Sequence, residues 1–240
     1  MEALMHKKNL TAFLKTLQLL PGEITACKTM PAQEAEFGPW PQINPQLTNA
    51  LKELGIKELY LHQTKAIDMA LAKKNVVVVT PTASGKTLCY NIPVIHSILE
   101  NHSSRALYIF PTKALSQDQL AEINAITNKI DMPISTCTYD GDTPPDIRTK
   151  VRAAGHVVVT NPDMLHIGIL PHHTKWIKLF ENLRYVVIDE LHTYKGVFGS
   201  HMSNVIRRLK RVCSFYGSNP TFILCSASIS NPAELAEGLI

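Results

Sequence analysis

The sequence predicts an α/β domain with a mostly parallel sheet that is covered by helices on both faces. Two observations predict this class. Short apolar runs alternate with stretches of helical periodicity, and most of the runs are continuously apolar, which is typical of strands buried on both faces. The runs are VVVV at 76–79, ALYIF at 106–110, ISTCTY at 134–139, HVVVT at 156–160, YVVID at 185–189 and FILCS at 222–226.

The intervals between these runs have helical patterns or helix signals. The expected helices are 45–55, 64–74, 88–100, 112–127, 144–154, 176–181 and 200–216, the first of them stopped by Gly55. Residues 1–45 are expected to form an extension. Its first 20 residues have an amphipathic helical pattern, and five prolines between 21 and 45 favour a strap without regular elements. Residues 46–240 form the domain.

Composition narrows the class of protein. The 240 residues carry a formal net charge of +4, which permits contact with nucleic acid without requiring it. The five cysteines are scattered and odd in number, with no C-x-x-C, so we expect reduced core thiols rather than a disulfide framework or a zinc site. No apolar run reaches the ~18 residues of a membrane span. The N-terminus lacks a signal-peptide cleavage site, and we expect a cytoplasmic protein.

The run VVVVTPTASGKT at 76–87 is a buried strand that leads into a phosphate-binding loop at the start of a helix. Backbone N–H groups of such a loop point at anionic oxygens, and the helix N-terminus adds positive potential. Lys86 is expected to reach the β- and γ-phosphates, and the Thr87 hydroxyl to hold Mg²⁺. Thr80 stands where the usual pattern has a glycine, so an ordinary strand–turn–helix is the alternative interpretation of the loop taken alone.

Polar side chains follow the other strands too, at the edge where ligands of such sheets bind. Asp189 comes directly after YVVI and is suited to hold Mg²⁺, and Glu190 can orient or deprotonate an attacking water. The structural alternative is a pair of carboxylates that favours the start of a helix. His192 could pass hydrogen bonds toward Ser226 or Ser228, or be an ordinary surface histidine.

Gln63 lies a short helix before the phosphate loop. A carboxamide can pair with both the donor and the acceptor on the edge of an adenine, whereas the alternative is a surface amide at a helix start. Tyr60 or Leu59 could pack on the base.

The motifs TPTASGKT, FPTKAL, TNPDML, DELH and SAS, in this order, resemble those of the first RecA-like lobe of a superfamily-two helicase of the DExH type. The stretches YLHQTKAI, TYDGDTPPDIR, ILPHHTKW and DELHTYKGVFGSHMSNVIRRLKR are similar to bacterial MrfA-type DNA helicases, which are implicated in crosslink repair. The resemblance implies a RecA-like P-loop NTPase fold and an ATP-dependent DNA helicase. It further implies translocation 3′ to 5′ on single-stranded DNA.

The resemblance also implies roles for individual residues. Gln63 would recognise adenine, and Asp189 and Glu190 would serve Mg²⁺ and water. The phosphates of ATP would be held by Thr82, Ala83, Ser84, Gly85, Lys86 and Thr87. A single strand would be gripped by Pro111, Thr112, Lys113, Thr160, Asn161, Pro162 and Asp163, where turn and capping chemistry is the alternative. Ser226 and Ser228 match the motif that couples hydrolysis to strand movement.

Helicases of this kind close a second RecA-like lobe over the nucleotide, and no such lobe is recognisable here. We therefore expect one lobe of a longer, monomeric protein that acts with a nuclease or another repair partner. An RNA helicase lobe and a non-motor nucleotide switch or scaffold remain alternatives. The basic helix with Arg207, Arg208, Lys210 and Arg211 is either a solvated face or a contact for nucleic acid or another domain. Residues 140–142 are expected to form a turn, and 170–174 a loop that binds no metal.

Overall fold

The computed structural model describes residues 12, 13, 15, 16, 34–81 and 84–240. The chain divides into two compact units, Met1–Ala35 and Glu36–Ile240. In the first unit Ala12, Phe13, Lys15 and Thr16 are helical, and the rest of the helix predicted for residues 1–20 lies outside the described residues. No described helix is long and apolar enough to cross a membrane.

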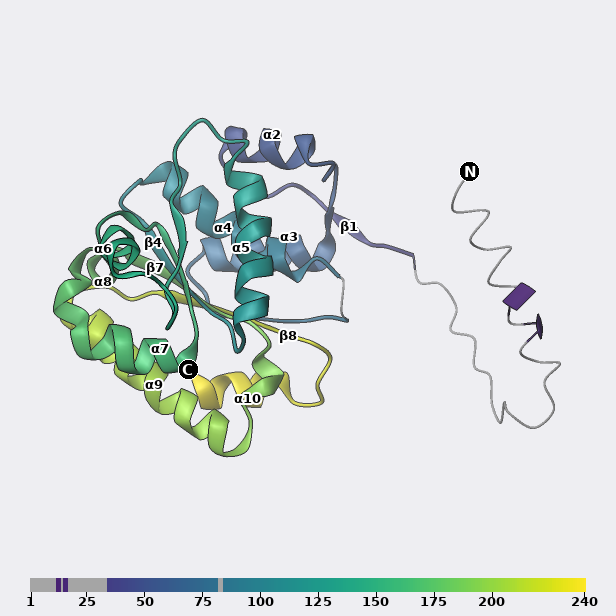
Figure 1. Cartoon of the computed structure of the whole chain (residues 1–240). Helices are drawn as coiled ribbons and strands as arrows, with labels where there is room; N and C mark the ends of the chain where they lie inside the picture. The colour runs from purple at the N-terminus through teal and green to yellow at the C-terminus, as the bar shows by residue number, and fades with distance from the viewer. Residues whose placement is uncertain (1–11, 14, 17–33, 82–83) are drawn as a thin grey trace. The chain divides into compact units, whose positions relative to one another are not determined.

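The second unit is built on a six-stranded sheet (Figure 1). Its strands are β3 (Val76–Val79), β4 (Arg105–Ile109), β5 (Thr136–Thr138), β6 (Val157–Thr160), β7 (Leu183–Ile188) and β8 (Thr221–Ser226). The order across the sheet is β3-β8-β7-β4-β6-β5, and every pair is parallel. The predicted parallel sheet is therefore confirmed, and the carboxyl ends of all six strands meet at one edge.

Helices cover both faces of this sheet. They are α2 (Pro45–Glu53), α3 (Leu61–Leu71), α4 (Lys86–Glu100), α5 (Lys113–Thr127), α6 (Pro145–Ala154), α7 (Pro162–Met164), α8 (Ile177–Glu181), α9 (Gly196–Phe215) and α10 (Pro232–Leu239). Val187 joins the core formed with α2 to α5, and its neighbour Val186 joins the core formed with α8 and α9. The central strands are mostly apolar because successive side chains enter opposite cores.

Two expectations needed correction, and one helix had not been expected. The Pro-rich segment contains a short strand, β1 (Phe37–Gly38), which pairs antiparallel with β2 (Leu59–Tyr60), because the prolines that follow Gly38 leave its own N–H groups intact. Residues 170–174, predicted to form a loop, lie in a 3₁₀ helix, η2 (Leu170–Lys175), which follows a π-helix, η1 (Leu165–Ile169). Helix α10 was not predicted. The remaining predicted elements are present with ends shifted by a few residues.

The described cysteines agree with the prediction of core thiols. Cys89, Cys213 and Cys225 are buried and Cys137 is partly buried, all four without a disulfide, whereas Cys27 lies outside the described residues.

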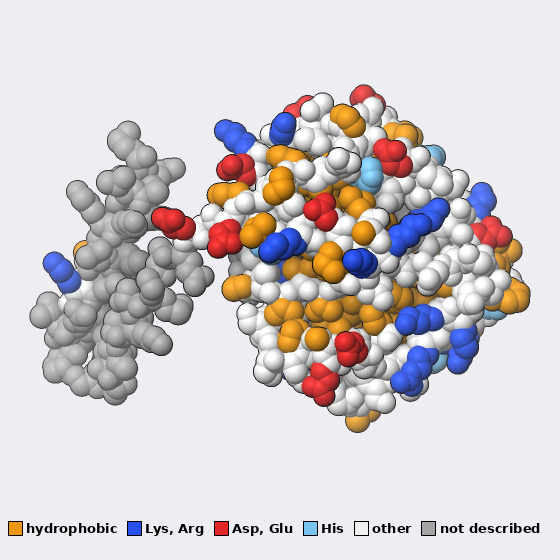
Figure 2. All heavy atoms as spheres, turned by 180° about the vertical axis from the view of Figure 1, so that it is seen from behind, with side chains coloured by type: hydrophobic (Ala, Val, Ile, Leu, Met, Phe, Trp, Pro, Cys, Tyr) orange, Lys and Arg blue, Asp and Glu red, His pale blue; other side chains and the backbone are white. Residues whose placement is uncertain are grey.

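Surface charge is unevenly spread. On the reverse face, Lys and Arg side chains gather toward the lower right, apart from most of the Asp and Glu side chains (Figure 2).

Candidate functional site

The phosphate-binding loop leaves β3 at the carboxyl edge of the sheet and enters α4. Gly85 caps the helix in the left-handed conformation, with φ +73°, and a Cβ there would lie 2.4 Å from Gln63 Nε2. Both facts require glycine at this position. The hydroxyls of Thr80 and Ser84 hydrogen-bond across the loop, so the threonine that replaces the usual glycine ties the two ends of the loop together.

Lys86 begins α4, and its side chain folds back over the loop. The ammonium donates hydrogen bonds to the carbonyl oxygens of Thr80, at 3.0 Å, and Pro81, at 2.8 Å. These bonds hold the cation at the mouth of the loop, where a phosphate oxygen can exchange for a carbonyl. Thr82 and Ala83, two of the predicted phosphate ligands, lie outside the described residues.

Gln63 joins the phosphate loop to β2. Its side chain is 2% exposed; Oε1 accepts from Tyr60 N–H at 2.8 Å, and Nε2 donates to the Gly85 carbonyl at 2.8 Å. One N–H and one oxygen lone pair of the carboxamide remain for the edge of a base. Gln63, which is predicted to recognise adenine, therefore lies against the phosphate loop.

An aromatic stack lies beside Gln63. The Tyr60 ring stacks on Phe37, with centroids 5.3 Å apart, and on His62, at 5.7 Å. Phe37 is 50% exposed and Tyr60 39%, whereas Leu59 is fully buried. Of the two residues considered for base packing, only Tyr60 is available. Phe37 was missed because a two-residue strand in a Pro-rich segment has no periodic signal.

Asp189 follows β7 at the same edge, 9% exposed. Its Oδ1 accepts from Glu190 N–H at 2.7 Å, and Oδ2 lies 3.2 Å from the Tyr90 hydroxyl, which also lies 2.6 Å from Gln119 Oε1. Burial, with the neighbouring Glu190 charge, raises the pKa of Asp189 despite these hydrogen bonds. A buried carboxylate of this kind gains stability from a bound cation, which fits the predicted Mg²⁺ ligand.

Glu190 occupies the left-handed region, with φ 52°, which is strained for a residue with a side chain. Its Oε2 lies 3.2 Å from His192 Nδ1, and the same nitrogen lies 3.4 Å from Ser226 Oγ. Ser226 ends β8, whereas Ser228 is exposed beyond the strand. The structure therefore brings His192 between Glu190 and Ser226, and does not bring Ser228 into hydrogen-bonding contact.

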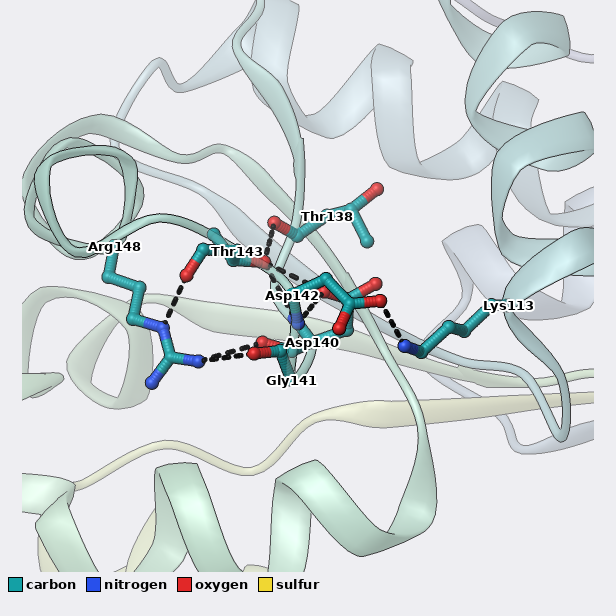
Figure 3. Close-up of polar contacts among 7 residues, drawn as sticks. All are labelled: Lys113, Thr138, Asp140, Gly141, Asp142, Thr143 and Arg148. Atoms are coloured by element: carbon teal, nitrogen blue, oxygen red, sulfur yellow. Dashed lines mark hydrogen bonds and ion pairs between the residues drawn. The ribbon is translucent and has the colours of Figure 1, made fainter.

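The loop after β5 contacts the start of α5 (Figure 3). The exposed Lys113 ammonium pairs with the carboxylate of Asp142. Asp140 Oδ1 accepts from the Asp142 N–H at 2.9 Å, and Arg148 Nη2 donates to the carbonyls of Asp140 and Gly141, both at 3.1 Å. Residues 140–142 are the predicted turn, and it is rigidly held. A phosphate approaching Lys113 therefore competes with the Asp142 carboxylate for the ammonium charge.

Both predicted strand-binding motifs, residues 111–113 and 160–163, show helix capping. Thr112 Oγ1 accepts from Leu115 N–H at 3.4 Å to cap α5, and Asn161 Oδ1 accepts from Met164 N–H at 2.8 Å to cap α7. Thr160 is buried, and its hydroxyl donates to the Tyr139 carbonyl at 2.7 Å. Pro162 is also buried, whereas Asp163 is exposed and Pro111 partly so. Lys113, Thr112, Asn161 and Asp163 remain at the surface for a strand to touch.

A sequence model of the DEAD/DEAH box helicase family matches residues 60–235. The ATP-dependent helicase YprA of Bacillus subtilis is 56% identical over 98% of this chain and 31% of its own length. The ATP-dependent helicase HRQ1 of Saccharomyces cerevisiae is 39% identical over 92% of this chain and 21% of its own.

The crystal structure of the DUF1998 helicase MrfA bound to DNA superimposes with a TM-score of 0.85 and 60% identity. That match covers 86% of this chain and 30% of MrfA, and a further MrfA crystal structure holds DNA and AMPPNP. The chain thus spans about a third or less of the length of these relatives.

Proposed function

This chain belongs to the DEAD/DEAH box helicase family, and from that premise we propose that it is the ATP-binding lobe of an ATP-dependent DNA helicase. We propose further that the helicase moves 3′ to 5′ on single-stranded DNA in DNA repair. One observation carries this function: the phosphate loop, the Asp189–Glu190 pair and the Lys113 loop lie at the same edge of one parallel sheet. Relatives that bind DNA and AMPPNP support DNA and ATP as ligands.

The residues present fit Mg²⁺–ATP. Bound ATP supplies the phosphoanhydride bond that is hydrolysed. Lys86 and the loop N–H groups would hold the phosphates, and the Thr87 hydroxyl and Asp189 carboxylate would hold the metal ion. The Glu190 carboxylate would accept a proton from the attacking water, with His192 beside it to keep the carboxylate oriented. Gln63 would bind the base edge, with Tyr60 and Phe37 available to stack on its face.

We propose that a second RecA-like lobe completes the site. In comparable phosphoryl transfer an added arginine is worth about 10³–10⁵ in rate. The described lobe by itself should therefore bind nucleotide weakly and hydrolyse it slowly. A monomeric cytoplasmic protein with a nuclease or another repair partner is the further expectation for the whole molecule.

The test is ATP hydrolysis by the whole helicase that carries this lobe, with and without single-stranded DNA. We expect stimulation by DNA in the unmodified protein. Lys86→Ala should abolish turnover and weaken ATP binding, and Glu190→Gln should abolish turnover while sparing ATP binding. Turnover of several per second by the 240-residue chain alone would contradict the proposed need for a second lobe.

Two other functions are separated by the same assay. An RNA helicase would be stimulated more by RNA than by a DNA oligonucleotide of the same sequence. A nucleotide switch would hydrolyse ATP at a rate that neither polymer changes. The match to a DNA-bound relative at 60% identity favours DNA.

A further inference from the structure

A cationic hollow lies beside α9, away from the nucleotide site. It has a volume of about 280 Å³ and is lined by His166 of η1 and by His201, Asn204, Arg207, Arg208 and Arg211 of α9. A second hollow of about 350 Å³ shares Arg208 and Arg211 and continues to Phe215. We call the two hollows together the basic groove.

The groove follows one face of α9. His201, Asn204, Arg208 and Arg211 are separated by three, four and three residues, which is the spacing of one helical face. Helix α9 contains four Lys or Arg residues and no Asp or Glu. The groove therefore carries a line of positive charge that its own helix does not neutralise.

Two of the three groove arginines are held by neutral acceptors rather than by carboxylates. Arg207 Nη1 donates to Asn204 Oδ1 at 3.2 Å, and Arg208 Nη1 donates to the His166 carbonyl at 3.4 Å. Within the part of the chain that the structure describes, no carboxylate lies in ion-pair contact with any of the three guanidinium groups. Their positive charge is therefore available to an anionic ligand. A guanidinium group suits phosphate because it can donate to two phosphate oxygens at once.

The groove lies close along the chain to the proposed strand edge. Asn161 caps α7, η1 follows α7 directly, and His166 lies three residues after Asp163, about one helical turn. At the far end Phe215 is 76% exposed. An aromatic ring beside a row of cations is the combination with which proteins bind single strands, since phosphates contact the cations and bases stack on the ring.

We propose that the basic groove is a second binding site for single-stranded DNA, outside the strand path of the Lys113 and Asn161 loops. Phosphates contact Arg207, Arg208 and Arg211, and a base stacks on Phe215. The proposal rests on the proposed function only in taking DNA as the polyanion. Its place beyond Asn161 suits the stretch of strand that has left the motor path or has not yet entered it.

The test is fluorescence anisotropy of a labelled 20-nucleotide single strand with the chain at several salt concentrations. Each phosphate contact contributes about 0.7 to the slope of log affinity against log salt for single strands. Arg207→Gln/Arg208→Gln/Arg211→Gln should therefore reduce the slope by about 2 and weaken binding at low salt. Phe215→Ala removes the exposed ring without changing charge, so it should weaken binding with little change in slope.

The matched control is Lys57→Gln/Lys74→Gln/Lys210→Gln, which removes three exposed cations that do not line the groove. Lys210 is on α9 itself, so the control also tests the helix. Equal affinities and slopes for the two triple variants would overturn the proposal. A larger loss for blunt duplex than for the single strand, or displacement of DNA by polyglutamate at equal charge, would overturn it too.

The experiments distinguish a failure of the groove proposal from a failure of the proposed helicase function. Equal DNA binding by the two triple variants would contradict the groove proposal but not the proposed DNA-stimulated hydrolysis. Absence of stimulation by DNA would contradict the proposed helicase function, whereas weaker DNA binding by the arginine variant would still support the groove proposal.

Discussion

Replacing Asp189 by asparagine should stabilise the fold. The Tyr90 hydroxyl has one proton and two acceptors, Gln119 Oε1 at 2.6 Å and Asp189 Oδ2 at 3.2 Å. The single proton can serve only one of these oxygens at a time, so the buried Asp189 carboxylate competes with Gln119 for it. In Asp189→Asn, Nδ2 can donate to the Tyr90 oxygen while Tyr90 donates to Gln119, and the charge disappears from a site that is 9% exposed.

The magnitude follows from these contacts. One gained neutral hydrogen bond contributes about 0.5–1.5 kcal/mol, and relief of a buried acceptor that is only partly hydrogen-bonded contributes up to about 1–3 kcal/mol. Because the two describe the same atoms, we expect about 1–3 kcal/mol in total at neutral pH. For a chain of this size, 1 kcal/mol corresponds to roughly 2–4 °C in Tm.

The pH dependence has a definite sign. Burial raises the pKa of Asp189 in the folded state above its ordinary value of 3.8, so the folded protein holds this proton more tightly than the unfolded chain. The unmodified protein therefore loses stability from this group as pH rises through the folded pKa. Below pH ~3.8 the carboxyl is protonated in both states and can itself donate to Tyr90, so the advantage of asparagine should shrink there.

The assay is urea unfolding of the 240-residue chain in EDTA, from pH 4.5 to pH 8, for the unmodified protein and Asp189→Asn. Glu190→Gln is the matched control, because Glu190 is partly exposed and its carboxylate already faces His192. It should change the free energy of unfolding less. A lower free energy of unfolding for Asp189→Asn at pH 8, or a difference that does not vary with pH, would refute the reasoning.

Three further predictions concern other contacts. Asp142→Asn should tighten single-strand binding, measured by anisotropy, because it frees Lys113 from a competing carboxylate; weaker binding would contradict this. Gly85→Ala should lower the free energy of unfolding by about 1–3 kcal/mol and abolish ATP binding, since its Cβ meets Gln63 at φ +73°, and unchanged ATP binding would be contrary evidence. Burial lowers the pKa of His156 to about 4, so the unfolded chain takes up that proton first, and stability falls from pH ~6.5 to ~4. In His156→Asn the free energy of unfolding, measured with urea, should decrease between pH ~6.5 and ~4 by about 2–3 kcal/mol less than in the unmodified protein.

The sheet and the phosphate loop were predictable because both leave local signals. Continuous β-branched runs such as Val76–Val79 identify buried strands, and the glycine that the loop geometry requires stands directly before Lys86. Short elements were not predictable in the same way. Helices η1 and η2 owe their form to packing of residues such as Leu165 and Leu170 in the core, and a few residues are too short to show a period.

Side-chain partnerships across the fold were also beyond the sequence. Tyr90 lies one turn after Lys86 on α4, and Gln119 lies on α5; only packing of both helices on one face brings them to Asp189. The partner of Thr160 could not be predicted either. Its place in a motif suggested contact with a nucleic-acid strand, but its hydroxyl donates to the Tyr139 carbonyl. A motif specifies residue types, whereas burial decides which of their atoms remain available.

The Tyr90 hydroxyl shows why this site retains an unfavourable arrangement. It lies between Asp189, in the proposed nucleotide site, and α5, which begins at Lys113 with Thr112 as its N-cap, both in the proposed strand site. A core selected for stability alone would not leave two acceptors competing for one proton, and the asparagine variant removes that competition. A carboxylate that competes for its proton donor instead retains affinity for a cation, so the stability that Asp189→Asn recovers would measure what the proposed Mg²⁺ site gives up for metal binding.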